Sequence, residues 1–146
     1  MTNSYVEMKR EISEEINNFP SFYAFDTEQF EEGLVQLGLK RTDEDKVKSI
    51  GMGGFVRKED HGAYYEMHIN IARRKKMAID ADTTGEGFIY EMFYYELANH
   101  EYGYTQDVSH TLDALNFTFE EIEADPRLKH GLELAKAAVN SAERFY

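Results

Sequence analysis

The stretch "FIYEMFYYELANH" (residues 88–100) predicts a helix that is apolar on most sides, because its apolar side chains recur at the spacing of a helix and cover most of its circumference. Ile89, Phe93 and Leu97 share one face of such a helix, and other apolar residues widen that face. A helix with so broad an apolar surface must pack against neighbours on several sides. The pattern therefore predicts a central helix over about residues 87–100.

Further helices are expected before and after this central one. Apolar residues at three- and four-residue spacing predict an amphipathic helix from Tyr5 to Ile16. Asp26 or Thr27 begins the second helix, since a short polar side chain there can cap it. A long helix is expected from about residue 60 to 79, a shorter one over about 107–115, and a final helical segment from Thr118 with Pro126 opening its last helix.

Two short segments favour strands over helices. The segment "VKSIGMGGFV" (47–56) carries three glycines, which disfavour a helix interior, so it predicts a short strand leading into a turn. Such a strand could pair with "FYAF" (22–25). The expected fold is a predominantly helical α+β domain covering residues 1–146, with about five to six helices and at most a small two- or three-stranded sheet. Residues 1–20 could be an N-terminal helix appended to it.

Charge is the most informative bulk property of the 146-residue chain. It has 28 acidic residues against 16 Lys and Arg, a formal net charge of −12, and no cysteine for disulfides or thiolate metal sites. Such a charge repels nucleic acids and anionic membranes, so neither is expected as a partner. No signal peptide and no apolar run of membrane-spanning length are present, which predicts a cytoplasmic protein.

The acidic side chains have two interpretations. They either form a solvated face that keeps the protein in solution, or they attract a basic partner such as the nucleic-acid groove of another protein. The candidate partner-binding residues form three clusters: Glu28, Glu31 and Glu32; Asp43, Glu44 and Asp45; and Glu120, Glu121 and Glu123. One basic cluster, "ARRKK" (72–76), complements a helix C-terminus or holds an acidic segment of a partner or of a second copy.

A second set of candidate functional residues surrounds the end of the central helix: Glu96, Asn99, His100, Glu101 and Tyr102. Glu96 and His100 are four residues apart, so a helix places them on one face, as an acid/base or metal pair requires. The favoured interpretation is structural: a buried His100 ends the helix and hydrogen-bonds to Glu96 or to a tyrosine hydroxyl. No other histidine completes a zinc set, and no nucleotide-binding or nucleophile motif is present, so neither a metal nor a cofactor is expected.

Two stretches resemble a family of small uncharacterised proteins from phages and mobile elements of low-GC Gram-positive bacteria. "FYAFDTEQFEEGL" (22–34) is similar to its aromatic-Ala-Phe and Gln-Phe-x-Glu-Gly pattern, and "FIYEMFYYELANHEYGYTQDVSHTLDAL" (88–115) to its Tyr-Glu-x-x-Asn-His-Glu block. With "GGFVRKED" (53–60) the resemblance spans about residues 22–123. It implies a phage or mobile-element accessory gene. It assigns no catalytic residue, although the Asn-His-Glu block falls on Asn99, His100 and Glu101.

Three functional hypotheses follow. The leading one is a non-enzymatic acidic inhibitor of a basic, nucleic-acid-handling host defence protein, such as a CRISPR effector, that acts in the host cytoplasm in the manner of an anti-CRISPR or DNA mimic. The first alternative is a small metal-dependent or acid/base hydrolase built on Glu96, His100 and Glu101. The second is a self-assembling accessory protein, which would be a homo-oligomer.

Overall fold

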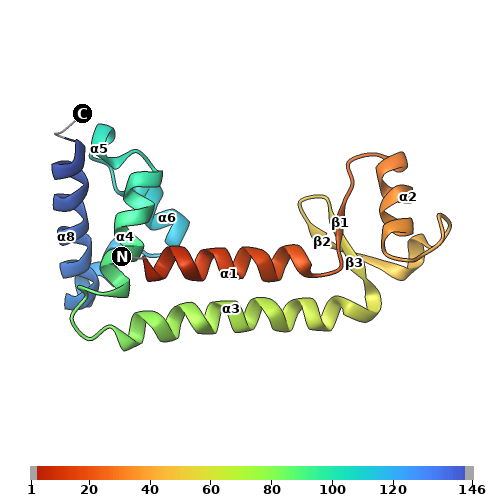
Figure 1. Ribbon diagram of the computed structural model, residues 1–146, viewed down its shortest axis with the longest axis horizontal. Helices are drawn as coiled ribbons and strands as arrows, with labels where there is room; N and C mark the ends of the chain where they lie inside the picture. The colour runs from red at the N-terminus through yellow and green to blue at the C-terminus, as the bar shows by residue number, and fades with distance from the viewer. Residues whose placement is uncertain (1–2, 144–146) are drawn as a thin grey trace. The chain divides into compact units, whose positions relative to one another are not determined.

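The computed structural model describes residues 3–143, which contain eight α-helices, two 3-10 turns and three strands (Figure 1). The predicted class, predominantly helical α+β with a small antiparallel sheet, is confirmed. There are more helices than the five or six expected, because short ones also form near the C-terminal end. The elements are α1 (Ser4–Asn18), β1 (Phe22–Tyr23), α2 (Thr27–Gln36), η1 (Glu44–Lys46), β2 (Val47–Gly51), β3 (Gly54–Arg57), η2 (Lys58–Asp60), α3 (His61–Ala81), α4 (Phe88–Asn99), α5 (Tyr102–Thr105), α6 (Ser109–Leu115), α7 (Phe119–Ala124) and α8 (Pro126–Glu143).

The chain divides into two compact units. Unit 1 comprises Met1–Glu11 and Arg74–Tyr146, and unit 2 comprises Ile12–Arg73. Both divisions fall inside continuous helices, α1 and α3. Within residues 3–143, no helix combines the length and the apolar character that crossing a membrane requires.

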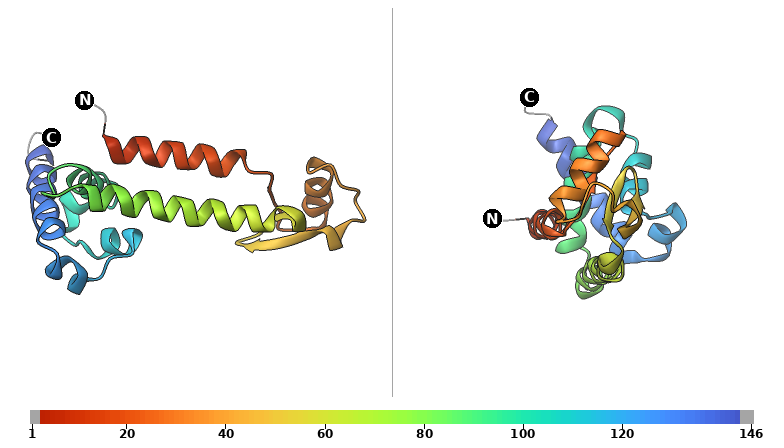
Figure 2. Two further views of the ribbon diagram at one scale, coloured as in Figure 1. Left: turned by 90° about the horizontal axis from the view of Figure 1, so that it is seen from below. Right: turned by 90° about the vertical axis from the view of Figure 1, so that its right-hand side faces the viewer.

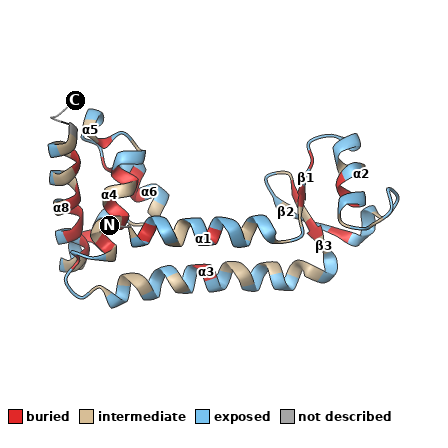
Figure 3. Ribbon diagram, viewed as in Figure 1, coloured by how far each residue is buried: buried red, intermediate tan, exposed pale blue. Residues whose placement is uncertain are grey.

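The core of unit 1 forms between α4 and α8, which lie side by side in Figures 1 and 2. Ile89, Phe93 and Leu97 are fully buried, which confirms the predicted central helix, and Figure 3 shows the buried residues along both helices. Gly131 of α8 permits the close approach, because a Cβ atom there would lie 2.6 Å from Cγ2 of Ile89 on α4. Burial of three large apolar side chains on one helix contributes about 5–9 kcal/mol to folding before entropy is subtracted.

The connection between α3 and α4 is held by one carboxylate and one guanidinium. Asp82 accepts backbone hydrogen bonds of 2.9 to 3.3 Å from the amides of Thr84, Gly85, Gly87 and Ile89. Burial raises the pKa of Asp82, but these four bonds outweigh it and leave the pKa below its ordinary value. Arg127 of α8 donates to the carbonyl oxygens of Ile79 and Asp82 and pairs with Asp125. The loop is therefore fixed mainly through its backbone.

The sheet of unit 2 has the strand order β1-β3-β2, and both pairs are antiparallel. Phe22 pairs with Phe55, so "FYAF" does pair with the glycine-rich segment as predicted. That segment forms two strands rather than the single one expected. Gly51 and Gly53 adopt φ angles of +88° and +81°, and with Met52 at +55° they turn the chain back on itself.

The core of unit 2 is small and aromatic. Leu34 of α2 is fully buried, and the stacked rings of Phe22 and Phe55 lie 5.4 Å apart between centroids. The ring of Phe30 meets Phe55 edge-on at 5.0 Å. Gly33 admits the Phe22 ring to the helix, since a Cβ there would lie 2.1 Å from it. Figure 3 shows buried residues on β1, β3 and the inner face of α2.

Candidate functional site

A buried carboxylate in unit 1, that of Glu96, is the centre of a polar cluster. Glu96 lies on α4 and is 3% exposed. Its Oε1 atom accepts a hydrogen bond of 2.9 Å from the Tyr5 hydroxyl and lies 3.0 Å from the Lys9 ammonium. Tyr5 and Lys9 are four residues apart on α1, so the helix presents both on one face. The charge of Glu96 is thus compensated where it is buried.

His100 engages the other carboxylate oxygen. It caps the C-terminus of α4, where its backbone N–H donates to the carbonyl oxygen of Glu96 at 3.0 Å. Its Nε2 atom lies 3.3 Å from Oε2 of Glu96. The predicted helix end and the predicted contact with Glu96 are both present. The expected burial is not, because the His100 side chain is 29% exposed.

The cluster holds Tyr5 in its neutral form. Burial, then the negative charge of Glu96 and the hydrogen bond to it, raise the pKa of the Tyr5 hydroxyl above its ordinary value. The Lys9 ammonium also lies 5.5 Å and 5.3 Å from the ring centroids of Tyr5 and Tyr95, within cation–π range. Both oxygens of Glu96 are therefore engaged, and its use as a general base would first have to release one of these contacts.

A pocket of about 410 Å³ opens beside this cluster. Tyr5, Lys9, Glu96 and His100 form part of its wall. The rest of the lining is contributed by α3, by the first turns and the last residue of α4, and by the end of α6 with the residues after it: Lys75, Ile79, Phe88, Met92, Asn99, Ala114, Leu115, Asn116 and Phe117. It is large enough for a small organic molecule.

The structure separates the five candidate residues at the end of α4. Glu96, Asn99 and His100 line the pocket. Glu101 is exposed, adopts a left-handed φ of +59° before α5, and does not line the pocket. Tyr102 is 6% exposed and belongs to the apolar core.

Tyr5 and Lys9 are pocket residues that the sequence did not single out as functional. In the sequence they belong to the amphipathic pattern of the first helix, Tyr5 on its apolar face and Lys9 among its charges. The spacing of four residues does place the Tyr5 hydroxyl and Lys9 on one helix face, and this was the signal in the sequence that could have identified them. Among the described residues, no group of three or more His, Asp or Glu side chains is placed to hold a metal ion.

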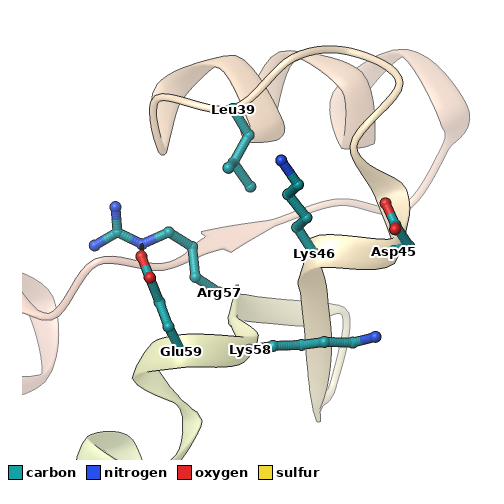
Figure 4. Close-up of a pocket in the computed structure, with 6 residues that line it drawn as sticks. All are labelled: Leu39, Asp45, Lys46, Arg57, Lys58 and Glu59. Atoms are coloured by element: carbon teal, nitrogen blue, oxygen red, sulfur yellow. Dashed lines mark ion pairs between the residues drawn. The ribbon is translucent and has the colours of Figure 1, made fainter.

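Unit 2 has a pocket of its own, of about 420 Å³ (Figure 4). Leu39 and Lys46 point into it from the segment between α2 and β2, while Arg57 and Glu59 lie on the side of η2. The Arg57 guanidinium is already held by Asp60 at 2.7 Å and by Glu59 at 3.5 Å. The lining carries charges of both signs, three cations and two carboxylates, beside Leu39, so it does not present one type of charge to a ligand.

The three predicted acidic clusters lie on the surface. The first is on α2 and the second at η1, both in unit 2, and the third is on α7 in unit 1. Several members have partners: Glu31 pairs with Arg41, Asp43 with Lys46, Glu123 with Lys129, and Glu121 completes a capping box with Thr118. The other members are exposed and form no ion pair with any described residue: Glu28, Glu32, Glu44, Asp45 and Glu120.

Comparison with known proteins gives one match. A family model matches residues 4–138, and its description is that of a family of unknown function, DUF7659. No curated protein and no solved structure matches the chain.

Proposed function

The chain belongs to DUF7659, a family of unknown function, and we propose that it is a non-enzymatic binding protein whose acidic surface engages a basic partner. In the finer form of the proposal, the partner is a nucleic-acid-handling defence protein such as a CRISPR effector. The chain is then a phage or mobile-element accessory protein that acts in the host cytoplasm. Its carboxylates take the place of nucleic-acid phosphates in the partner's groove.

Unneutralised carboxylates on unit 2 are the observation that carries this proposal. Residues 12–73 contain 12 acidic and 7 basic side chains. Glu28 and Glu32 are four residues apart on α2, which places them on one face with Cβ atoms about 6 Å apart. Neither pairs with a cation among the described residues, and Glu44 and Asp45 are exposed in the same unit. A basic partner would be steered toward these charges, most strongly at low salt.

Exposed aromatic side chains beside α2 support the same proposal. Tyr23 and Phe25 are 59% and 79% exposed, and Met52 at the hairpin turn is 92% exposed. The Phe25 ring covers Gly53, where a Cβ would lie 2.5 Å from it, so Phe25 and the turn adjoin. Large apolar side chains with a polar surround are typical of the residues that contribute most to protein–protein affinity. In the proposed complex the carboxylates set the rate of encounter, and these side chains anchor it.

The test is whether the protein protects a plasmid from destruction in bacteria that carry a CRISPR or restriction system. Wild-type protein is expected to restore transformation by a targeted plasmid. Glu32→Lys should lower association with the inhibited effector about threefold to tenfold, because a charge at the edge of an interface acts mainly through steering. The matched control is Glu66→Lys, which changes the net charge equally at an exposed residue of α3 outside the clusters.

Two results would contradict the proposal. One is that the wild-type protein protects against none of the systems assayed. The other is that Glu32→Lys and Glu66→Lys reduce protection equally, which would make the effect one of net charge alone. A third result would contradict only the phosphate mimicry: binding that does not weaken with salt and that occurs while nucleic acid is bound to the effector. The exposed aromatic side chains would then remain as the binding surface.

The hydrolase alternative receives less support from the geometry. It needs Glu96, His100 and Glu101 to act together, but Glu101 does not line the pocket. Glu96 itself is occupied by Tyr5, Lys9 and His100. No specific contact supports the self-assembly alternative. The mass of the protein in solution tests it, because a self-assembling protein would be a homo-oligomer.

A further inference from the structure

The pocket beside Glu96 differs in charge from the unit that contains it. Unit 1 has 16 acidic and 9 basic residues. The pocket lining instead includes two lysines and one carboxylate, and that carboxylate is compensated by Lys9. Lys75 remains, and it forms no ion pair or hydrogen bond with any described residue. An acidic protein thus has a pocket whose uncompensated charge is positive.

The polar and apolar parts of the lining specify a ligand with two ends. Asn99 and Asn116 are exposed at the pocket and carry amide N–H donors, which suit an oxyanion together with the lysine ammonium groups. Phe88 and Phe117 provide aromatic surface in the same pocket. A volume of about 410 Å³ accommodates a single aromatic ring with a charged substituent.

We propose that this pocket binds a small organic anion, with a carboxylate, phosphate or sulfonate group on an apolar body of aromatic size. Lys75 provides the attracting charge. Glu96 acts as a positioning residue: it holds Lys9 at the wall, so that the ammonium can donate its remaining N–H groups to the ligand. The proposed site lies within unit 1 and does not depend on the acidic clusters or on the partner proposed above.

The test is a titration of the full chain with ring compounds that differ in charge. Binding is monitored through the chemical shifts of the amide signals in an NMR spectrum. Phenyl phosphate, benzoate and naphthalene-1-sulfonate are the anionic probes, and benzylamine is the cationic control. At least one anion is expected to give saturable shifts at Lys75, Asn99, His100 and Asn116, and benzylamine none. Lys75→Gln should weaken that anion about tenfold, the loss of one charge-assisted contact.

Lys76→Gln is the matched control, because Lys76 is also exposed to solvent, pairs with Asp80 at 2.8 Å and does not line the pocket. It should leave the affinity for the anion unchanged. Three results would overturn the proposal: no saturable shift with any of the three anions, equal binding of benzylamine, or equal weakening by the two lysine substitutions. The melting curve of Lys75→Gln should match that of the wild type, which would show that the variant is folded and that its weaker binding is due to the lost ligand contact.

Discussion

The two units of the chain obtain their stability in different ways. The core of unit 1 collects apolar side chains from α1, α4, α5, α6, α7 and α8 around the fully buried Phe93, and it accommodates a charged cluster at Glu96. The core of unit 2 consists of a few side chains around Phe22 and Leu34, with further rings packed on it. A large core can offset the cost of a buried carboxylate, because many other contacts surround it. A small core depends on each ring and on each close approach.

Truncation of one fully buried side chain in each unit should have the largest effect and tests that contrast. Phe93→Ala should lower the free energy of opening α4 and α8 by about 3–5 kcal/mol, through lost burial and a cavity. Leu34→Ala should cost about 2–5 kcal/mol, and in so small a core it should remove most protection from the sheet. Native-state amide exchange measures both. Full protection of β1 and β3 in Leu34→Ala would contradict the account of unit 2.

Two glycine substitutions in unit 2 test whether its small core depends on a close approach. Gly33→Ala should destabilise by about 1–3 kcal/mol, because its Cβ would lie 2.1 Å from the Phe22 ring. Gly62→Ala meets no atom within 4 Å and replaces a glycine in the first turn of α3. It should therefore be neutral or stabilise by up to about 1 kcal/mol. Thermal melts should show a lower melting temperature for Gly33→Ala and an unchanged or higher one for Gly62→Ala. Equal shifts would mean that the approach of Phe22 to α2 does not limit stability.

The smallest expected effect is a difference in alkaline sensitivity between the units. Burial raises the pKa of Tyr5 in unit 1 and that of Tyr64 in unit 2, and Glu96 raises the pKa of Tyr5 further. A raised folded pKa stabilises fully below the unfolded value of 10.0, and this contribution is lost as the pH rises toward the folded pKa. Each unit of pH in that window costs up to about 1.4 kcal/mol per tyrosine.

Tyr5→Phe should therefore flatten the decline of stability above pH 10 more than Tyr64→Phe does. Denaturant unfolding at a series of alkaline pH values gives the two slopes. Both variants remove one phenol and keep the ring, so each is the control for the other. Equal slopes would contradict the larger rise in pKa that burial and Glu96 together give Tyr5.

Local patterns in the sequence were enough to predict most elements of the fold. The apolar periodicity of Ile89, Phe93 and Leu97 located α4, Pro126 marked the start of α8, and the glycines after Ser49 located the turn. The short helix α5 was not predicted. It is bounded by Glu101 and Gln106, which adopt the left-handed backbone conformation. Glutamate and glutamine seldom adopt that conformation, so their presence does not predict it.

The candidate site was predictable only where its residues are close in the sequence. Glu96 and His100 are four residues apart, and helical spacing alone brings them together. Tyr5 is 91 residues from Glu96 and Lys9 is 87, so their contacts depend on how α1 packs in unit 1. The division into two units was equally hidden, because it falls within α1 and α3 and no change of composition marks it.

The loop after α3 has a consequence for which substitutions the chain can accept. Asp82 bonds mainly to backbone amides, and Arg127 reaches the carbonyl oxygens of Ile79 and Asp82. These contacts require no particular side chain at the residues that they fix, except at Gly85, where φ is +87° and a Cβ would lie 2.2 Å from the carbonyl oxygen of Arg127. Selection can then act strongly on the side chains of Asp82 and Arg127, while exposed positions such as Thr83 vary freely. In an alignment of relatives, we expect this segment to show a few conserved residues separated by highly variable positions.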